Sequence, residues 1–241
     1  MNLLRLGRGQ DSPFPHTGNA LNEPNGLLAW GGDLSVPRLR TAYRHGIFPW
    51  YSEGQPILWW SPDPRAGFNP CAMHIPRRLA RWLRNCQWTM SSDTCFDDVV
   101  EACAAPRDDD GGTWITAEMR SAYAALHRAG DAHSIEVFAG DRLVGGLYGV
   151  ASGSVFCAES MFSGEDHASK VAVLGLADHW QRAGGAWIDA QIPSAHLATL
   201  GAITVARGDY LDLLAIPALP VMWTPMHFRA RDLINKLVNH A

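Results

Sequence analysis

The sequence predicts an α/β fold of the α+β kind, in which a small N-terminal domain over residues 1–65 precedes a larger domain over residues 66–241. Two observations lead to this expectation. The first domain is crowded with proline- and glycine-containing turns, which interrupt helices and central strands. In the second, the spacing of apolar residues alternates between the helical and the strand period. A length of 241 residues with 47% hydrophobic content allows one large core or two unequal ones.

One short helix is expected within the first domain, in the run SVPRLRTAYRHG. Ser35 can cap it, Pro37 suits its first turn, and Gly46 can end it. The remaining segments read as turns, so this domain is expected to have little core of its own.

A second helix is expected in the run IPRRLARWLRN, beginning at Pro76. A step of 100° per residue places Arg77, Arg81 and Arg84 in one narrow sector, with the leucines and Trp82 on the opposite side. Such an arginine face suits contacts with phosphates, although an ordinary solvated outer face has the same composition. Both interpretations remain open from this helix alone.

A third helix is expected from Thr116 to Gly130. The loop before it, RDDDGGTWIT, is charged and contains glycine, which is consistent with a mobile loop anchored by Trp114.

The pattern changes to strands from His133 onward. The runs HSIEVFAG, DRLVGGLYGVASG and SVFCAESMFS read as three consecutive antiparallel strands. They are followed by a helix, a strand, a short helix, a strand and a last helical turn or two, in the runs ASKVAVLGLADHWQRAGG, AWIDAQI, SAHLATLG, ITVAR and DYLDLLAIP. This order predicts a mixed, largely antiparallel sheet. It is also the order of GNAT-type acyltransferases, so acyl transfer is a candidate activity by fold analogy.

The letters of a coenzyme A motif occur between Gln181 and Ala186, where the sequence QRAGGA fits Q/R-x-x-G-x-G/A. Phosphate binding by this motif requires the N-terminus of a helix, whereas here the glycines follow a long helix and precede a strand. Carbonyl groups at a helix C-terminus repel phosphate. We therefore interpret Gly184 and Gly185 as helix-ending residues and reject coenzyme A binding.

Composition points to a soluble protein of the cytoplasm. No run of 18 apolar residues could span a membrane, and the first residues lack the apolar region of a signal peptide. Five cysteines without a CxxC motif indicate free thiols in a reducing compartment. Ten histidines show no metal-ligand spacing such as HExxH, so we expect no metal site.

The net charge of −4 is unevenly distributed. Residues 1–90 hold ten arginines and five acidic residues, whereas residues 91–241 hold ten basic and nineteen acidic residues. These halves carry +5 and −9. Chance unevenness would explain this, but so would a basic half for a polyanion and an acidic half for a cationic partner.

Taken together, the segments resemble the leucyl/phenylalanyl-tRNA–protein transferases. The matching runs extend from about residue 3 to about residue 215 and are EPNGLLAWGGDLS, YRHGIFPWYS, PILWWSPDPR, GTWIT, HSIEV, LVGGLYGV, FCAESMFS and ASKVAVL. The resemblance implies a small N-terminal domain and a GNAT-like catalytic domain. It also implies transfer of Leu or Phe, and less readily Met, from aminoacyl-tRNA to proteins with N-terminal Arg or Lys, which marks them for N-end rule degradation. No DNA or membrane partner is implied.

The resemblance also suggests a use for two tryptophans in turns. Trp50 and Trp114 match residues that contact the terminal adenosine of the tRNA. Stacking of a base on an aromatic ring contributes about 1–3 kcal/mol. Trp59 and Trp60 are expected instead to fix the proline-rich corner around them.

For the chemistry, an aminoacyl ester is already activated, so we expect no cofactor. Orienting two substrates is worth about 7–11 kcal/mol, more than base strength can supply here. Asp189 and Gln191, two residues apart on a predicted strand, are expected on one face, with Asp189 orienting the Gln191 amide toward the attacking amine. Both match family residues with this role, and Glu159 matches a carboxylate at the acceptor site.

The resemblance places the donor side chain among a further set of residues, which are Leu147, Phe156, Ala158, Met161, Ser163, Leu176 and Ile188. Two other classes of protein remain as alternatives. A coenzyme A-dependent N-acetyltransferase is opposed by the misplaced glycine motif. A non-enzymatic RNA-binding module would leave the carboxylates and Gln191 without a purpose.

Overall fold

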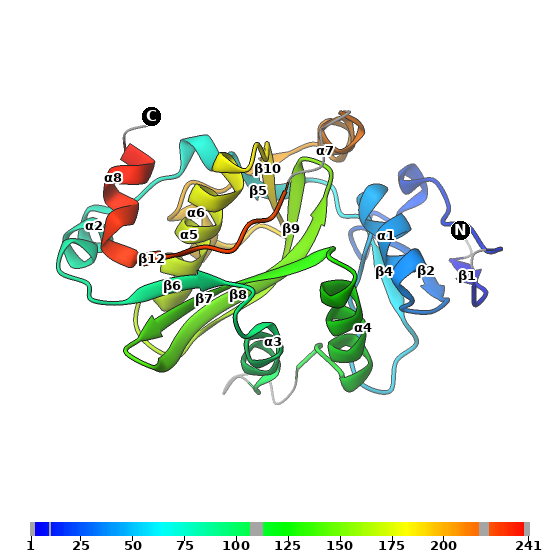
Figure 1. Cartoon of the computed structure of the whole chain (residues 1–241). Helices are drawn as coiled ribbons and strands as arrows, with labels where there is room; N and C mark the ends of the chain where they lie inside the picture. The colour runs from blue at the N-terminus through cyan, green and yellow to red at the C-terminus, as the bar shows by residue number, and fades with distance from the viewer. Residues whose placement is uncertain (1–2, 10, 107–112, 217–221, 239–241) are drawn as a thin grey trace.

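The computed structural model describes residues 3–9, 11–106, 113–216 and 222–238. Within them the chain forms a small four-stranded sheet and a large eight-stranded sheet, with helices on both faces of the large one (Figure 1).

The small sheet is made by the first 60 residues and has the strand order β1-β2-β4-β3. Its first two strands are parallel and the other pairs antiparallel. The predicted first helix, α1, spans Val36–Arg44. Gly46 follows its C-terminal cap and has a φ of +70°, which favours glycine. The strands are β1 (Leu4–Leu6), β2 (Leu27–Gly31), β3 (Phe48–Pro49) and β4 (Leu58–Trp60).

The large sheet has the order β11-β5-β10-β9-β8-β7-β6-β12. Every neighbouring pair is antiparallel except β9 and β10, so the predicted mixed, largely antiparallel sheet is confirmed. Its strands are β5 (Arg65–Phe68), β6 (Thr89–Ser92), β7 (Ala132–Ala139), β8 (Arg142–Ser152), β9 (Val155–Ser163), β10 (Trp187–Gln191), β11 (Ile203–Val205) and β12 (His227–Arg229).

The helices predicted after residue 65 are present. Five strands and α-helices after residue 65 were not predicted, namely β5, β6, α3, β12 and α8. The helices are α2 (Arg77–Arg84), α3 (Phe96–Ala104), α4 (Ala117–Arg128), α5 (Ala168–Arg182), α6 (Ala195–Ala198), α7 (Arg207–Ala215) and α8 (Leu233–Val238).

Two hydrophobic cores lie on opposite faces of the large sheet. One joins α3 and α4 to α1 and the small sheet, so that Leu39 and Trp59 belong to the same core as Val99 and Tyr123. The other packs α2, α5 and α8 against the second face. The N-terminal segment therefore shares its core with the rest of the chain, which agrees with the expectation that it has little of its own.

The parallel strands β9 and β10 pair over a short distance and then separate. Their ladder ends at the pair Cys157–Asp189. Beyond it, β9 has a register irregularity opposite Tyr148 and Gly149, and β10 has one between Asp189 and Gln191. Unpaired strands leave room for side chains between them, so this fork is where a site can form.

Among the helices in the described ranges, none is long and apolar enough to cross a membrane.

Candidate functional site

Asp189 is fully buried at the end of the β9–β10 ladder, where Arg65 holds both of its oxygens. The Nε of Arg65 donates to Oδ1 at 2.8 Å and Nη2 donates to Oδ2 at 2.6 Å. Asp189 also accepts from the hydroxyl of Tyr210 at 3.1 Å and from the backbone N–H of Gln191 at 2.8 Å. The carboxylate is thus saturated by donors on this chain and is a structural anchor for β10.

Arg65 is equally enclosed, with 1% of its surface exposed. Its guanidinium lies over the rings of Phe48 and Tyr210 and donates to the carbonyl of Gly46. Burial alone would lower the pKa of Arg65, but the adjacent carboxylate of Asp189 raises it above its usual value. The pair joins the end of the N-terminal segment to β10.

Gln191 departs from the strand geometry expected for it. Its φ is +61°, a region that non-glycine residues adopt at a cost of about 1–3 kcal/mol and mostly at functional sites. Its side-chain Nε2 donates to Oε1 of Glu159 at 2.8 Å. The expected contact of the Gln191 amide with the carboxylate of Asp189 is therefore wrong. Arg65 occupies that carboxylate, and the irregularity after Asp189 breaks the two-residue alternation.

Glu159 is the centre of a buried hydrogen-bond network on β9. The hydroxyl of Tyr123 donates to its Oε2 at 2.6 Å, and the hydroxyls of Tyr43 and Tyr123 are 2.8 Å apart. Burial raises the pKa of Glu159 to about 7, with a smaller contribution from the negative charge of Asp189, while the two tyrosine hydroxyls oppose the shift. A carboxyl group with this pKa can hold or release a proton near neutral pH.

An apolar cavity of about 120 Å³ opens beside Glu159 and Gln191. Five of the seven residues expected around the donor side chain line it, and they are Leu147, Ala158, Met161, Leu176 and Ile188. Phe68, Val173 and Leu197 complete the apolar wall. An apolar cavity of about 150 Å³ can hold a benzene ring, so this cavity is of the right order for one side chain that is unbranched at Cβ, such as that of Leu or Phe.

Phe156 and Ser163 are not among the residues lining this cavity. Phe156 is fully buried further along β9, where its ring packs edge-on against Trp180 and stacks on Trp223. Ser163 ends β9 and uses its hydroxyl locally, donating to the carbonyl of Glu165 and accepting from the N–H of Ser169 at the start of α5. Both positions are explained by packing and capping.

Trp50 and Trp114 come from two segments of the chain. Trp50 is 39% exposed and follows β3, while Trp114 is half-buried two residues before the Thr116 cap of α4. The hydroxyl of Tyr51 donates to Glu118 in the first turn of α4 at 3.1 Å, which ties the two segments together. Residues 107–112 of the loop expected to be mobile lie outside the described residues.

The arginine face of α2 forms as predicted. Arg77, Arg81 and Arg84 are exposed, and Leu79 and Leu83 are buried against the second core. In Figure 1, α2 and β4 lie at opposite ends of the molecule. Trp50 lies beside β4, because its backbone N–H donates to the carbonyl of Leu58. A single ligand that contacts both α2 and Trp50 must therefore extend across the molecule.

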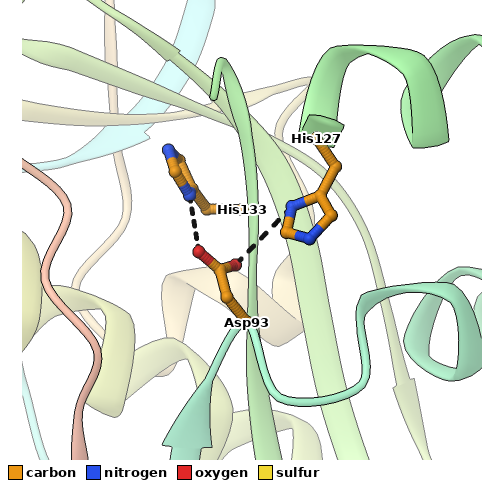
Figure 2. A group of neighbouring side chains, drawn as sticks. All are labelled: Asp93, His127 and His133. Atoms are coloured by element: carbon orange, nitrogen blue, oxygen red, sulfur yellow. Dashed lines mark hydrogen bonds and ion pairs between the residues drawn. The ribbon is translucent and has the colours of Figure 1, made fainter. Parts of the chain in front are cut away.

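One group of ligand-type side chains within the described ranges could hold a metal ion, namely Asp93, His127 and His133. Figure 2 shows one ring nitrogen of each histidine, the Nδ1 atom, joined to the carboxylate of Asp93 by a dashed line. The Nδ1 of His133 is 2.8 Å from Oδ2 of Asp93. The Nδ1 of His127 is 2.8 Å from the carbonyl of Ala132, which can only accept, so this nitrogen carries the proton. These contacts favour a hydrogen-bonded cluster over a metal site.

The segment with the coenzyme A letters has the geometry expected of a helix end. Helix α5 stops at Arg182, and the backbone N–H groups of Gly184 and Gly185 donate to the carbonyls of Gln181 and Trp180. Gly184 has a φ of +88°. These glycines terminate α5 and are not at a helix N-terminus.

Sequence reasoning missed three partners of the site carboxylates. Arg65 and Tyr210 hold Asp189, and Tyr123 holds Glu159. Tyr123 lies at helical spacing on the inner face of α4, where an aromatic residue reads as ordinary core. The one available signal was Arg65, which ends the proline-rich run SPDPR and has no acidic residue near it in the following sequence.

Comparison with known proteins identifies the chain. Residues 68–215 match the family model described as leucyl/phenylalanyl-tRNA protein transferase, and residues 32–63 match the model of that family's N-terminal domain. A protein of Xanthomonas euvesicatoria pv. vesicatoria (strain 85-10) is 58% identical over 207 residues, covering 86% of this chain and 83% of its own length. One from Pseudomonas putida (strain W619) is 56% identical over 202 residues, covering 84% of this chain and 89% of its own.

A third relative, from Xanthomonas oryzae pv. oryzae (strain MAFF 311018), is 55% identical over 224 residues and covers 91% of this chain and 90% of its own length. All three are named leucyl/phenylalanyl-tRNA–protein transferase. Together with the α+β fold and its forked sheet, these matches define an aminoacyltransferase. The chain belongs to the leucyl/phenylalanyl-tRNA protein transferase family, which confirms the identification made from the sequence motifs.

Proposed function

We propose that this protein transfers Leu or Phe, and less readily Met, from aminoacyl-tRNA to the N-terminal Arg or Lys of proteins in the cytoplasm, marking them for N-end rule degradation. The observation that carries the proposal is the apolar cavity of about 120 Å³ with Glu159 and Gln191 at its edge. The cavity suits the donor side chain, and the two polar groups suit an acceptor that is both a nucleophile and a cation.

The donor half of the reaction would use the cavity and Trp50. The Leu or Phe side chain would occupy the space between Leu147, Met161 and Ile188, and the terminal adenosine would stack on Trp50 and Trp114. This arrangement leaves the ester carbonyl at the mouth of the cavity. The proline-rich corner supplies rigidity, because Trp59 is fully buried and the Nε1 of Trp60 donates to the carbonyl of Trp50 at 2.7 Å.

The chemical step forms one C–N bond and breaks one C–O bond. The neutral α-amine attacks the ester carbonyl, the ribose oxygen leaves, and the amine gives up a proton that ends on that oxygen. Gln191 would orient the amine through its Oε1 atom, which accepts no hydrogen bond from the described residues. Because Nε2 of Gln191 is held by Glu159, the orienting role assigned to Asp189 passes to Glu159.

Glu159 would also recognise the acceptor charge. Its pKa of about 7 is close to that of an α-amine, about 7.7–8.0, so a proton can pass between them at little cost. A cationic Arg or Lys side chain nearby would favour the ionised form of Glu159 and gain a charge-assisted contact. Asp189, saturated by Arg65, is the structural support of this arrangement.

The activity is tested by a label-transfer assay. The protein is incubated with an Arg-terminated peptide and either radiolabelled Leu-tRNA, Phe-tRNA or acetyl-CoA. We expect label from both aminoacyl-tRNAs and none from acetyl-CoA, because the glycines after α5 are at its C-terminus. Transfer from acetyl-CoA alone, or no transfer with intact RNA binding, would replace the proposal with one of the two alternative classes.

Acceptor recognition is tested by Glu159→Gln, which keeps the shape of the side chain and removes its charge. We expect kcat/KM for Arg- and Lys-terminated peptides to fall roughly 10- to 150-fold, as for loss of a charge-assisted contact worth about 1.5–3 kcal/mol. Affinity for Leu-tRNA should be nearly unchanged. The control is Glu136→Gln, another buried carboxylate of the same sheet, which is held by Ser91 and Ser134 away from the cavity. An equal loss in both variants would assign the effect to folding.

A further inference from the structure

Two of the ten tryptophans, Trp30 and Trp50, belong to neither hydrophobic core. The other eight are buried in a core or packed against one. Trp50 has the proposed role of stacking on the terminal adenosine. Trp30, half-buried in β2, has no role in the site described above.

Trp30 and Trp50 flank the same residue of the small sheet. Trp30 pairs with Leu58 across the β2–β4 ladder, and the backbone N–H of Trp50 donates to the carbonyl of Leu58 at 3.0 Å. Neighbouring strands are about 4.8 Å apart, which places the two tryptophan backbones roughly 10 Å from each other. A stacked single strand rises about 3.4 Å per nucleotide, so no more than about three nucleotides span this separation.

Trp30 lies in a groove of about 860 Å³ on the small sheet, together with Arg5, Arg8, Gln55 and Glu118. The guanidinium of Arg5 lies 5.2 Å from the centre of the Trp30 ring. The groove adjoins the segment that carries Trp50. Glu118 accepts from the hydroxyl of Tyr51, and Gln55 accepts from the backbone N–H of Ser52.

The groove has a surplus of free positive charge. Neither Arg5 nor Arg8 forms an ion pair with any residue that the structure describes. Of the two acidic residues of the groove, Asp33 lies 4.0 Å from the guanidinium of Arg38, which balances its charge. Within the described ranges the two arginines are therefore opposed by one unpaired carboxylate, that of Glu118, which accepts from the neutral hydroxyl of Tyr51. An aromatic ring beside unpaired guanidiniums is the combination that binds single-stranded nucleic acid through a base and its phosphates.

We propose that this groove binds the unpaired nucleotides that precede the terminal adenosine of the tRNA donor. Trp30 stacks on one base, and Arg5 and Arg8 contact the adjoining phosphates. The inference rests on the proposed function, in which Trp50 receives the adenosine. The charge of the groove makes the acceptor protein a less suitable occupant, because the N-terminal Arg or Lys of that protein would be repelled by the guanidiniums of Arg5 and Arg8.

The test compares two donors with one Arg-terminated peptide. Phenylalanyl-adenosine has no nucleotide before its adenosine. A phenylalanylated minihelix ending in an unpaired CCA carries two, and these are the nucleotides that the groove is expected to bind. The variants are Trp30→Leu and Arg5→Gln, and Arg5→Gln is the safer one because Arg5 is exposed. The matched control is Arg128→Gln, an exposed arginine at the far end of α4 from Glu118.

We expect Trp30→Leu to raise KM for the minihelix roughly 5- to 150-fold and Arg5→Gln to raise it about 5-fold. Both variants should leave KM for phenylalanyl-adenosine unchanged. Arg5→Gln should also lower the log–log salt dependence of minihelix binding by about one. Unchanged KM for the minihelix, an equal rise for both donors, or an equal effect of Arg128→Gln would overturn the inference. Failure of the unmodified protein to use either donor would instead overturn the proposed function.

Discussion

The two carboxylates of the site are almost equally buried but differ in their partners. Asp189 faces the guanidinium of Arg65, whereas Glu159 faces two tyrosine hydroxyls and an amide, none of which carries a positive charge. Desolvation therefore dominates at Glu159 and raises its pKa to about 7. The same functional group, a carboxyl, thus serves as a fixed anchor in Asp189 and as a group that can change its charge in Glu159.

This difference predicts a pH dependence of stability. The pKa of Glu159 is about 7 in the folded protein against an ordinary value of 4.5, so the folded state holds the proton more tightly than the unfolded state. The stabilisation is fully present below about pH 4.5 and is lost as pH rises toward 7. Its total is about 3 kcal/mol, from 1.36 kcal/mol per pKa unit.

The measurement is urea unfolding of the unmodified protein and of Glu159→Gln between pH 4.5 and 8. We expect the variant to gain about 3 kcal/mol relative to the unmodified protein across this range. Glu165→Gln, at a partly exposed surface carboxylate whose partner Arg142 is itself exposed, corrects for changes elsewhere in the chain. A constant difference between the two proteins would show that Glu159 does not titrate in this interval.

The Arg65–Asp189 pair predicts a second effect. Asp189→Asn leaves a fully buried arginine without its counter-charge, which typically costs about 3–5 kcal/mol. Replacing both residues, as Arg65→Met with Asp189→Leu, should cost less than the sum of the single changes. Urea unfolding measures all three variants. If Asp189→Asn lowers the free energy of unfolding by less than about 1 kcal/mol, Asp189 is not a structural anchor, and a direct role in the transfer reaction becomes the better explanation for it.

The sequence predicted the site residues only in part. Glu159 stood out because an acid within an apolar strand requires a partner, and the structure supplies Tyr123 and Gln191. The partner of Asp189 could not be predicted, because Arg65 lies 124 residues away and only the folded sheet brings β5 beside β10. The left-handed backbone at Gln191 had no signal either, since no glycine or asparagine marks that position.

At the scale of elements, α2 was predicted well because its pattern is strong over two turns. The strands β5 and β6 were not predicted. Their sequences, RAGF and TMSS, are short, and neither shows clear alternation of apolar and polar residues. Both are strands because they pair with β10 and β7, so tertiary contacts decided their structure.

The arginine face of α2 predicts a salt effect. Replacing Arg77, Arg81 and Arg84 with Ala should weaken binding of any aminoacyl-tRNA alike and reduce the log–log salt dependence by about 2–3, if each arginine meets one phosphate. Arg78→Ala is the control, because this exposed arginine on the same helix lies outside the narrow sector. Preserved affinity and slope in the triple variant would leave α2 an ordinary solvated face.

At the scale of the whole molecule, residues 222–238 extend beyond the family match at residue 215 and complete the large sheet. This segment adds β12 along β6 and places α8 beside α2 and α5 (Figure 1). Within this segment, Trp223 stacks on His133 with ring centres 4.3 Å apart and on Phe156 at 5.5 Å. We propose residue 65 as the boundary between the N-terminal and catalytic domains, since β5 begins there.

Trp223→Ala tests whether this segment is integral to the fold. Removing the half-buried ring should lower the free energy of unfolding by about 2–4 kcal/mol, somewhat less than for a fully buried tryptophan. The control is Met222→Ala, because Met222 is 75% exposed and its loss should be neutral. If the two variants have the same free energy of unfolding in urea, residues 222–238 do not contribute to the stability of the large sheet.

The long separation between Arg65 and Asp189 also has a consequence in time. At about 5–20 residues per second, a ribosome needs roughly 6–25 s to add the 124 residues between them. During that interval Arg65 has been synthesised but Asp189 has not, so the ion pair that anchors β10 cannot form. The pairing of β9 with β10 cannot form either. A nascent chain of this protein therefore has no complete cavity, and cannot act on aminoacyl-tRNA, until Ile188, Gln191 and Leu197 of the cavity wall have been synthesised.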